Sequence, residues 1–200
     1  MKFTVYNEQQ EVPIAETLWR RAFHYAAGEL QIEHHHAHVA CFFLPAAAER
    51  KMKFKHAFTA GASGLAKDGA VFFVIASKDL EGGRMIKTFF HELTHVKQLL
   101  MSELIAKRTA RSIEWKGEKW DKQEYAFAPW EIEANACSAK FYEGFLRQEV
   151  SRIMKDANNH AYHVRSALRL VFPDDDLFRL TQELHREREA IKQGGKLCEA

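Results

Sequence analysis

The segment from Ala70 to about Lys107 constrains the fold of this chain more than any other. It begins with AVFFVIA, a run rich in Val, Ile and Phe that lies between the turn-forming pairs Asp68-Gly69 and Lys78-Asp79. Such a run predicts a β-strand over residues 70–77. Gly82-Gly83 then opens a helical apolar pattern that continues through about Lys107. We therefore expect a strand followed directly by a long helix.

The other segments predict one more strand and several helices. Apolar spacing predicts a helix over residues 14–30, VACFFL predicts a strand over residues 39–44, and AGASG at residues 60–64 is typical of a turn. Pro129 suits the first turn of a helix that runs to about Arg147, and Pro173 precedes the last helix. This order predicts an α+β fold. We expect one domain over residues 1–200, with its core at about 14–147 and a helical extension from about 148.

Residues 91–95 read HELTH, a match to the pattern H-E-x-x-H. Residues four apart face the same side of a helix, so His91 and His95 can bind one Zn²⁺. Glu92 would then lie beside the open coordination position, where it can take a proton from water. An apolar face is expected on the opposite side of the helix, formed by Ile86, Phe89, Phe90, Leu93, Val96, Leu100 and Leu104.

A third protein ligand is expected downstream, in the helix that starts PWEIEANA. Glu131 shares a polar stripe with Asn135, Ser138 and Tyr142, and this stripe contains no counter-charge. Glu133 instead falls among Lys140, Glu143 and Arg147, a mixture typical of a solvated face. Glu131 is therefore the better candidate, and Asn135 can hydrogen-bond a ligating histidine or orient the Glu131 carboxylate. The alternative is that both glutamates are surface charges and the third ligand lies elsewhere.

HELTH followed by EIEAN resembles the gluzincin-type metallopeptidases, in which Glu-x-x-x-Asp/Asn on a second helix completes an H-E-x-x-H site. EIEANA is most similar to the ImmA/IrrE family, and WKGEKW and PWEIEA resemble small metallopeptidases of phages and bacteria. The resemblance covers mainly residues 70–146. It implies a compact zincin-like domain, with a small mixed sheet packed on the active-site helix.

The resemblance also implies a role for each residue of the motif. His91, His95 and Glu131 would bind zinc, and Glu92 would be the catalytic acid/base. Ala70–Ala76 would be the edge strand against which an extended peptide substrate pairs. The implied function is a zinc metalloendopeptidase acting on protein or peptide substrates.

Three further features have a functional and a structural interpretation. Tyr125, just before the Glu131 helix, can donate a hydrogen bond to the tetrahedral intermediate or be a buried aromatic. His160 and His163 are alternatives for that role. The cluster HHHAH at residues 34–38 can bind metal if it is a strand, but no carboxylate or cysteine accompanies it, which favours a polar, half-exposed strand.

Residues 107–122 combine basic residues with Trp115 and Trp120, which is typical of a nucleic-acid contact or of a lid with packed aromatics. Glu114, Glu118 and Asp121 dilute the positive charge and favour the lid. The alternative function is a DNA-associated or regulatory protein that uses a zincin fold to bind a partner.

From the composition we expect a cytoplasmic protein. The net charge of +2 indicates no particular partner, and three widely spaced cysteines are typical of free thiols in a reducing compartment. The first residues contain no apolar stretch like that of a signal peptide. No apolar run approaches the length of a membrane span, so no membrane association is expected.

Overall fold

The fold is α+β, as expected, with four helices and two sheets in the ranges that the structure describes. The structure is a computed structural model. It describes residues 1–6, 16–44, 61–65, 70–76, 83–105, 112–121, 127–155, 168–169 and 172–197.

The larger sheet is mixed and has the strand order β1-β2-β4-β3. Strands β1 (Lys2–Tyr6), β2 (His38–Leu44) and β4 (Val71–Ala76) are parallel, and β3 (Gly61–Leu65) pairs with β4 in the antiparallel direction. The strands predicted at residues 39–44 and 70–77 are therefore confirmed. The pattern did not predict β1.

The edge role expected of Ala70–Ala76 is wrong. Strand β4 lies between β2 and β3, and its side chains Val71, Phe73 and Ile75 are buried. An interior strand needs apolar residues more than an edge strand does, which explains the AVFFVIA run. The edge strand on this side is β3, and it packs against helix α3 (Gly83–Leu100).

The turn expected at AGASG is also wrong, because Gly61–Leu65 forms β3. Packing against a neighbouring helix explains why a glycine is found in this strand. A Cβ atom on Gly61 would lie 2.6 Å from Oε1 of Glu92, a separation that real side chains do not adopt. Glycine at this position therefore lets the strand approach α3 closely.

Helix α3 is shorter than expected, because it ends at Leu100 instead of about Lys107. Ser102 has a left-handed backbone with φ of 54°. Its N–H donates to the Leu99 carbonyl over 3.1 Å, and the Glu103 N–H donates to the Gln98 carbonyl over 2.8 Å. This is a Schellman ending, and its left-handed position is usually occupied by glycine. A serine there gave no stop signal in the sequence.

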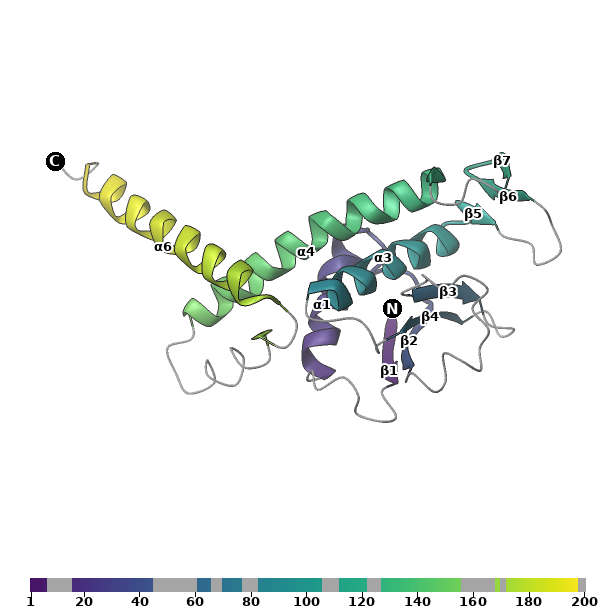
Figure 1. Cartoon of the computed structure of the whole chain (residues 1–200), viewed down its shortest axis with the longest axis horizontal. Helices are drawn as coiled ribbons and strands as arrows, with labels where there is room; N and C mark the ends of the chain where they lie inside the picture. The colour runs from purple at the N-terminus through teal and green to yellow at the C-terminus, as the bar shows by residue number, and fades with distance from the viewer. Residues whose placement is uncertain are drawn as a thin grey trace.

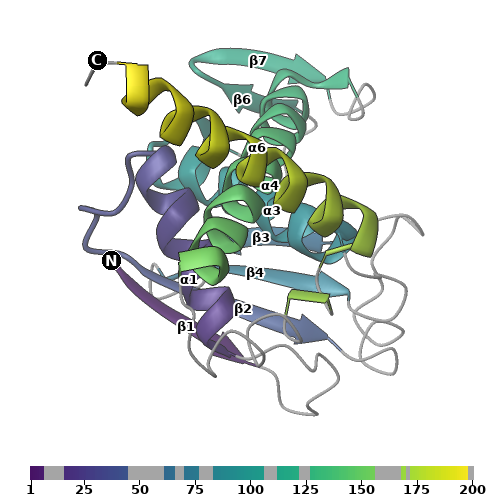
Figure 2. The ribbon, with the colours of Figure 1, turned by 90° about the vertical axis from the view of Figure 1, so that its left-hand side faces the viewer.

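Helix α3 lies between the sheet and the long helix α4 (Pro129–Lys155), as Figures 1 and 2 show. The expected apolar face of α3 is buried, with Phe89 and Phe90 at its centre. Helix α1 (Glu16–Glu29) adds Trp19 and Phe23 to the same core. Helix α4 begins at Pro129 as predicted but extends beyond Arg147.

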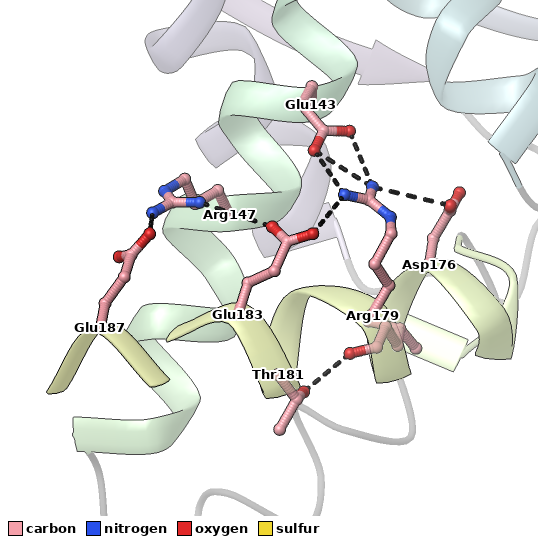
Figure 3. Close-up of polar contacts among 8 residues, drawn as sticks. Glu143, Arg147, Asp176, Arg179, Thr181, Glu183 and Glu187 are labelled. Carbon is pink, nitrogen blue, oxygen red and sulfur yellow. Dashed lines mark hydrogen bonds and ion pairs between the residues drawn. The ribbon is translucent and has the colours of Figure 1, made fainter. Parts of the chain in front are cut away.

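Helix α6 (Asp174–Leu197) packs on α4 through a buried leucine pair, Leu180 and Leu184. Figure 3 shows a row of ion pairs between the two helices. Arg179 lies 3.1 Å from both Glu143 of α4 and Glu183 of α6, and Arg147 of α4 pairs with Glu187. These arginines and glutamates are all partly exposed. Exposed ion pairs contribute little to stability, so we expect burial of the leucines to hold α6 more strongly than these ion pairs do.

The smaller sheet consists of β5 (Leu104–Ile105), β6 (Ser112–Trp115) and β7 (Glu118–Asp121). Lys116 and Gly117 join β6 to β7 with φ values of 48° and 88°, as in a two-residue hairpin turn. Trp115 and Trp120 contact Trp130 at the start of α4, with ring centroids 6.3 and 6.5 Å apart. The packed aromatics expected of residues 107–122 are therefore present.

Two compositional expectations bear on the described ranges. Cys41 and Cys137 are free thiols, and Cys198 lies outside the described residues. None of the helices in the described ranges has both the length and the apolar character that crossing a bilayer requires.

Candidate metal centre

The two histidines of HELTH come together on one side of α3, as predicted. Their Nε2 atoms are 3.0 Å apart, and their rings meet edge to face with centroids 4.7 Å apart. Glu131, in the first turn of α4, closes the group. Its Oε2 lies 3.3 Å from Nε2 of His91, and its Oε1 lies 3.4 Å from Nε2 of His95. One atom from each residue therefore points into a common centre.

These three residues fit a divalent metal ion. Zinc binds imidazole nitrogen and carboxylate oxygen at 2.0–2.2 Å, which places the ligand atoms of a tetrahedral site about 3.3 Å apart. The three separations in this group are 3.0, 3.3 and 3.4 Å. Two imidazoles and a carboxylate are also the protein ligands of many catalytic zinc sites, which keep a fourth position open.

Each histidine is held by a hydrogen bond at its other ring nitrogen. Nδ1 of His91 lies 3.0 Å from Oδ1 of Asn135, so the partner predicted for a ligating histidine is confirmed. Nδ1 of His95 lies 2.7 Å from Oε1 of Gln98, one turn further along α3. Hydrogen bonds of this kind fix the ring orientation of metal-binding histidines.

The protonation of His95 depends on the carboxylates beside it. Burial lowers the pKa of His95, but the hydrogen bond with Glu131 and the charges of Glu92 and Glu131 outweigh burial, so its pKa lies above the usual value. His95 is 5% exposed. The negative charges of the two carboxylates therefore favour a positive charge at this position.

Glu92 is 4% exposed and lies between the histidines and strand β3. Burial raises the pKa of its carboxyl group to about 7, although the charges of His95 and His91 lower it. Its Oε2 atom is buried and has no hydrogen-bond partner among the described residues. A buried carboxyl group with a pKa near neutrality and an unused oxygen is suited to exchange protons at neutral pH.

The solvated position expected for Glu133 is wrong. Its Oε2 accepts a hydrogen bond from Nε2 of Gln98 over 2.7 Å, and its Oε1 lies 3.5 Å from Nζ of Lys97. Lys140, its expected neighbour, pairs with Glu29 instead. The first turns of α4 pack over the last turns of α3, so Glu133 faces α3. A helical wheel of α4 alone contains no information about this packing.

Other candidates do not join the centre in the described ranges. Tyr125, His160 and His163 lie outside the described residues. The segment 34–38 is a strand only from His38 onward, and Nε2 of His38 lies 2.9 Å from the hydroxyl of Thr4. Within the part of the chain that the structure describes, the group of His91, His95 and Glu131 is the one with metal-binding geometry.

Sequence reasoning did not assign Gln98 and Ser63 to the centre. Gln98 follows His95 by three residues on the same polar side of α3, which is a recognisable signal. Ser63, whose hydrogen bond lowers the pKa of Glu92, lies on a strand that reads as a turn.

Comparison with known proteins adds no relative. No protein family model matches this chain, and neither curated proteins nor solved structures give a match.

Proposed function

We propose that this protein is a zinc-dependent endopeptidase. The observation that carries the proposal is the convergence of His91, His95 and Glu131 beside the buried carboxyl group of Glu92. The HELTH motif and its resemblance to gluzincin-type peptidases support the same function.

His91, His95 and Glu131 would hold the ion, with His91 on the more exposed side. A zinc ion held there would supply the positive charge that lowers the pKa of water and polarises a peptide carbonyl. Asn135 and Gln98 would keep both imidazoles in position during turnover.

Glu92 would move the proton. Its buried carboxyl group lies beside the two histidines, so it can accept a proton from the attacking water and then donate it to the leaving amine. Ser63 would hold the Glu92 carboxylate while it is charged, through the hydrogen bond that lowers its pKa.

An extended peptide is the substrate that the surroundings favour. Strand β3 ends the sheet next to Glu92, and its outer edge pairs with no strand among the described residues. Backbone groups at such an edge can hydrogen-bond an extended chain. Its first residue, Gly61, packs directly against the Glu92 carboxyl group, so a peptide paired with this edge would lie close to the proposed base.

Cleavage of a mixed peptide library, with products identified by mass spectrometry, tests the proposal. We expect cleavage by the zinc-loaded protein, loss of cleavage with a chelator, and recovery after zinc is added back. The double variant His91→Ala/His95→Ala is the control. Equal zinc content in this variant and the wild type would overturn the assignment of the ligands.

A further inference from the structure

The amide of Gln98 is fully buried between His95 and the start of α4, and all its polar groups are used. Its Oε1 lies 2.7 Å from Nδ1 of His95. Its Nε2 donates one hydrogen bond to the Trp130 carbonyl over 3.1 Å and one to Oε2 of Glu133 over 2.7 Å. Gln98 therefore joins a metal-binding histidine to two groups on α4.

The chemistry of these partners fixes the orientation of the amide. A carbonyl and a carboxylate accept hydrogen bonds and cannot donate them, so both N–H groups of Gln98 must point toward Trp130 and Glu133. Its oxygen must then face His95. Since that oxygen only accepts, Nδ1 of His95 must carry a proton, and the lone pair of the neutral ring lies on Nε2.

We propose that Gln98 is a positioning residue that, held by Glu133 and Trp130, presents Nε2 of His95 to the metal ion. The inference rests on the proposed function, because the lone pair on Nε2 of His95 matters only if a metal ion binds there. Metal-binding histidines usually donate to a carboxylate or a carbonyl group. Here the neutral amide of Gln98 lies between His95 and the carboxylate of Glu133.

The two histidines are held differently. Asn135, the partner of His91, is exposed, and no further partner is seen for its amide in the described ranges. The network of His95 is buried and continues outward, because Lys97 and Lys116 lie 3.5 and 3.7 Å from Oε1 of Glu133. The position of His95 is therefore fixed more tightly than that of His91.

Replacing Gln98 with methionine tests the inference. Gln98→Met keeps the size of the side chain and removes its hydrogen bonds. We expect zinc affinity, measured by competition with a chromophoric chelator, to fall about 10- to 100-fold. Gln182→Met, the same substitution at an exposed position of α6, is the matched control and should bind zinc like the wild type.

An exchange of partners separates positioning from packing. Gln98→Glu places two carboxylates side by side and should weaken zinc binding. Adding Glu133→Gln restores the donor–acceptor pair between residues 98 and 133 but not the hydrogen bond to the Trp130 carbonyl. The double variant should therefore bind zinc more tightly than Gln98→Glu alone and less tightly than the wild type. A purely packing role predicts no such recovery, because neither change alters the side-chain volume much.

The outcomes distinguish the two proposals. If the wild type and His95→Ala bind zinc equally, the proposed function fails, and this inference fails with it. If the wild type alone binds zinc and a folded Gln98→Met binds it equally well, only the inference is overturned. If Gln98→Met does not fold, recovery by the exchange supports the inference, and absence of recovery overturns it.

Discussion

Gly61 lies so close to Glu92 that the carboxyl group occupies the place where a side chain at residue 61 would begin. A Cβ atom there would be 2.6 Å from Oε1 and 2.7 Å from Cγ of Glu92. The first prediction follows from this contact. Gly61→Ala should displace the carboxyl group, so that peptide cleavage falls at least about tenfold while zinc content stays the same.

The control for this change lies on the same strand. A Cβ atom on Gly64 would meet the ring of Phe72 at 3.2 Å, far from the carboxyl group. Gly64→Ala should therefore retain most of the cleavage activity. Equal loss of activity in both variants would indicate damage to the strand and would contradict the proposed contact.

The second prediction concerns the proton carrier. Glu92→Gln keeps the shape of the side chain but cannot accept a proton from water. We expect zinc binding and the melting temperature of the zinc-loaded protein to be nearly unchanged, and cleavage to fall about 100-fold or more. Parallel zinc analysis and peptide assays provide the measurement. Substantial remaining activity would assign the proton transfer to another group.

The third prediction ranks the glutamates of α4. Glu131→Ala removes a ligand and should lose zinc under mild chelation. Glu133→Ala should weaken zinc binding less, because it acts on the ion through Gln98 and His95. Glu143→Ala, in the ion-pair row with Arg179, is the control and should bind zinc like the wild type. Competition with a chelator measures the zinc affinity of the three variants. An affinity of Glu131→Ala equal to that of the control would contradict the assignment of Glu131 as a ligand.

The fourth prediction is a pH dependence of the metal-free protein. Folding raises the pKa of Glu92 from 4.5 to about 7, so the folded state binds its proton more tightly than the unfolded state. This contribution to the free energy of unfolding is fully present below about pH 4.5 and is lost as pH rises through 7. The raised pKa of His95 acts in the same direction. In Glu92→Gln, the free energy of unfolding should fall less between about pH 5 and pH 7 than it does in the wild type. Denaturant unfolding of both proteins at each pH, with a chelator present, measures this difference. Identical pH dependence would contradict it.

The fifth prediction compares the leucines and the ion pairs that attach α6. Leu180 is fully buried, so Leu180→Ala should lower the free energy of unfolding by about 2–5 kcal/mol. Arg179→Ala breaks exposed ion pairs and should lower it by at most about 1 kcal/mol. Equal losses in a urea titration would assign the attachment to the charges.

The grouping of His91, His95 and Glu131 could be predicted largely from local patterns. The spacing of His91 and His95 is fixed by the helical period, and the polar stripe of Glu131 and Asn135 belongs to one helix. Each pair needs only a correct assignment of its helix. The approach of the two helices then follows from the apolar faces that they share.

The missed features depend on contacts between elements. The sequence of β3 resembles a turn because it contains glycines. Gly61 is required by the close packing of the strand against Glu92 of α3, and not by a bend in the chain. The environment of Glu133 is set by the crossing of α3 and α4, which no single wheel contains. The end of α3 was missed for a local reason, since Ser102 occupies a position where glycine is the usual signal.

The tryptophan contacts beside the centre provide an optical reporter. Trp130 directly precedes Glu131, its carbonyl accepts a hydrogen bond from Gln98, and its ring contacts those of Trp115 and Trp120. A shift in the first turn of α4 on ion binding would change the surroundings of these three indoles. Trp19, the fourth indole of the chain, lies in the core against Phe89 and would give a steady background. Intrinsic fluorescence can therefore follow ion loading without a label.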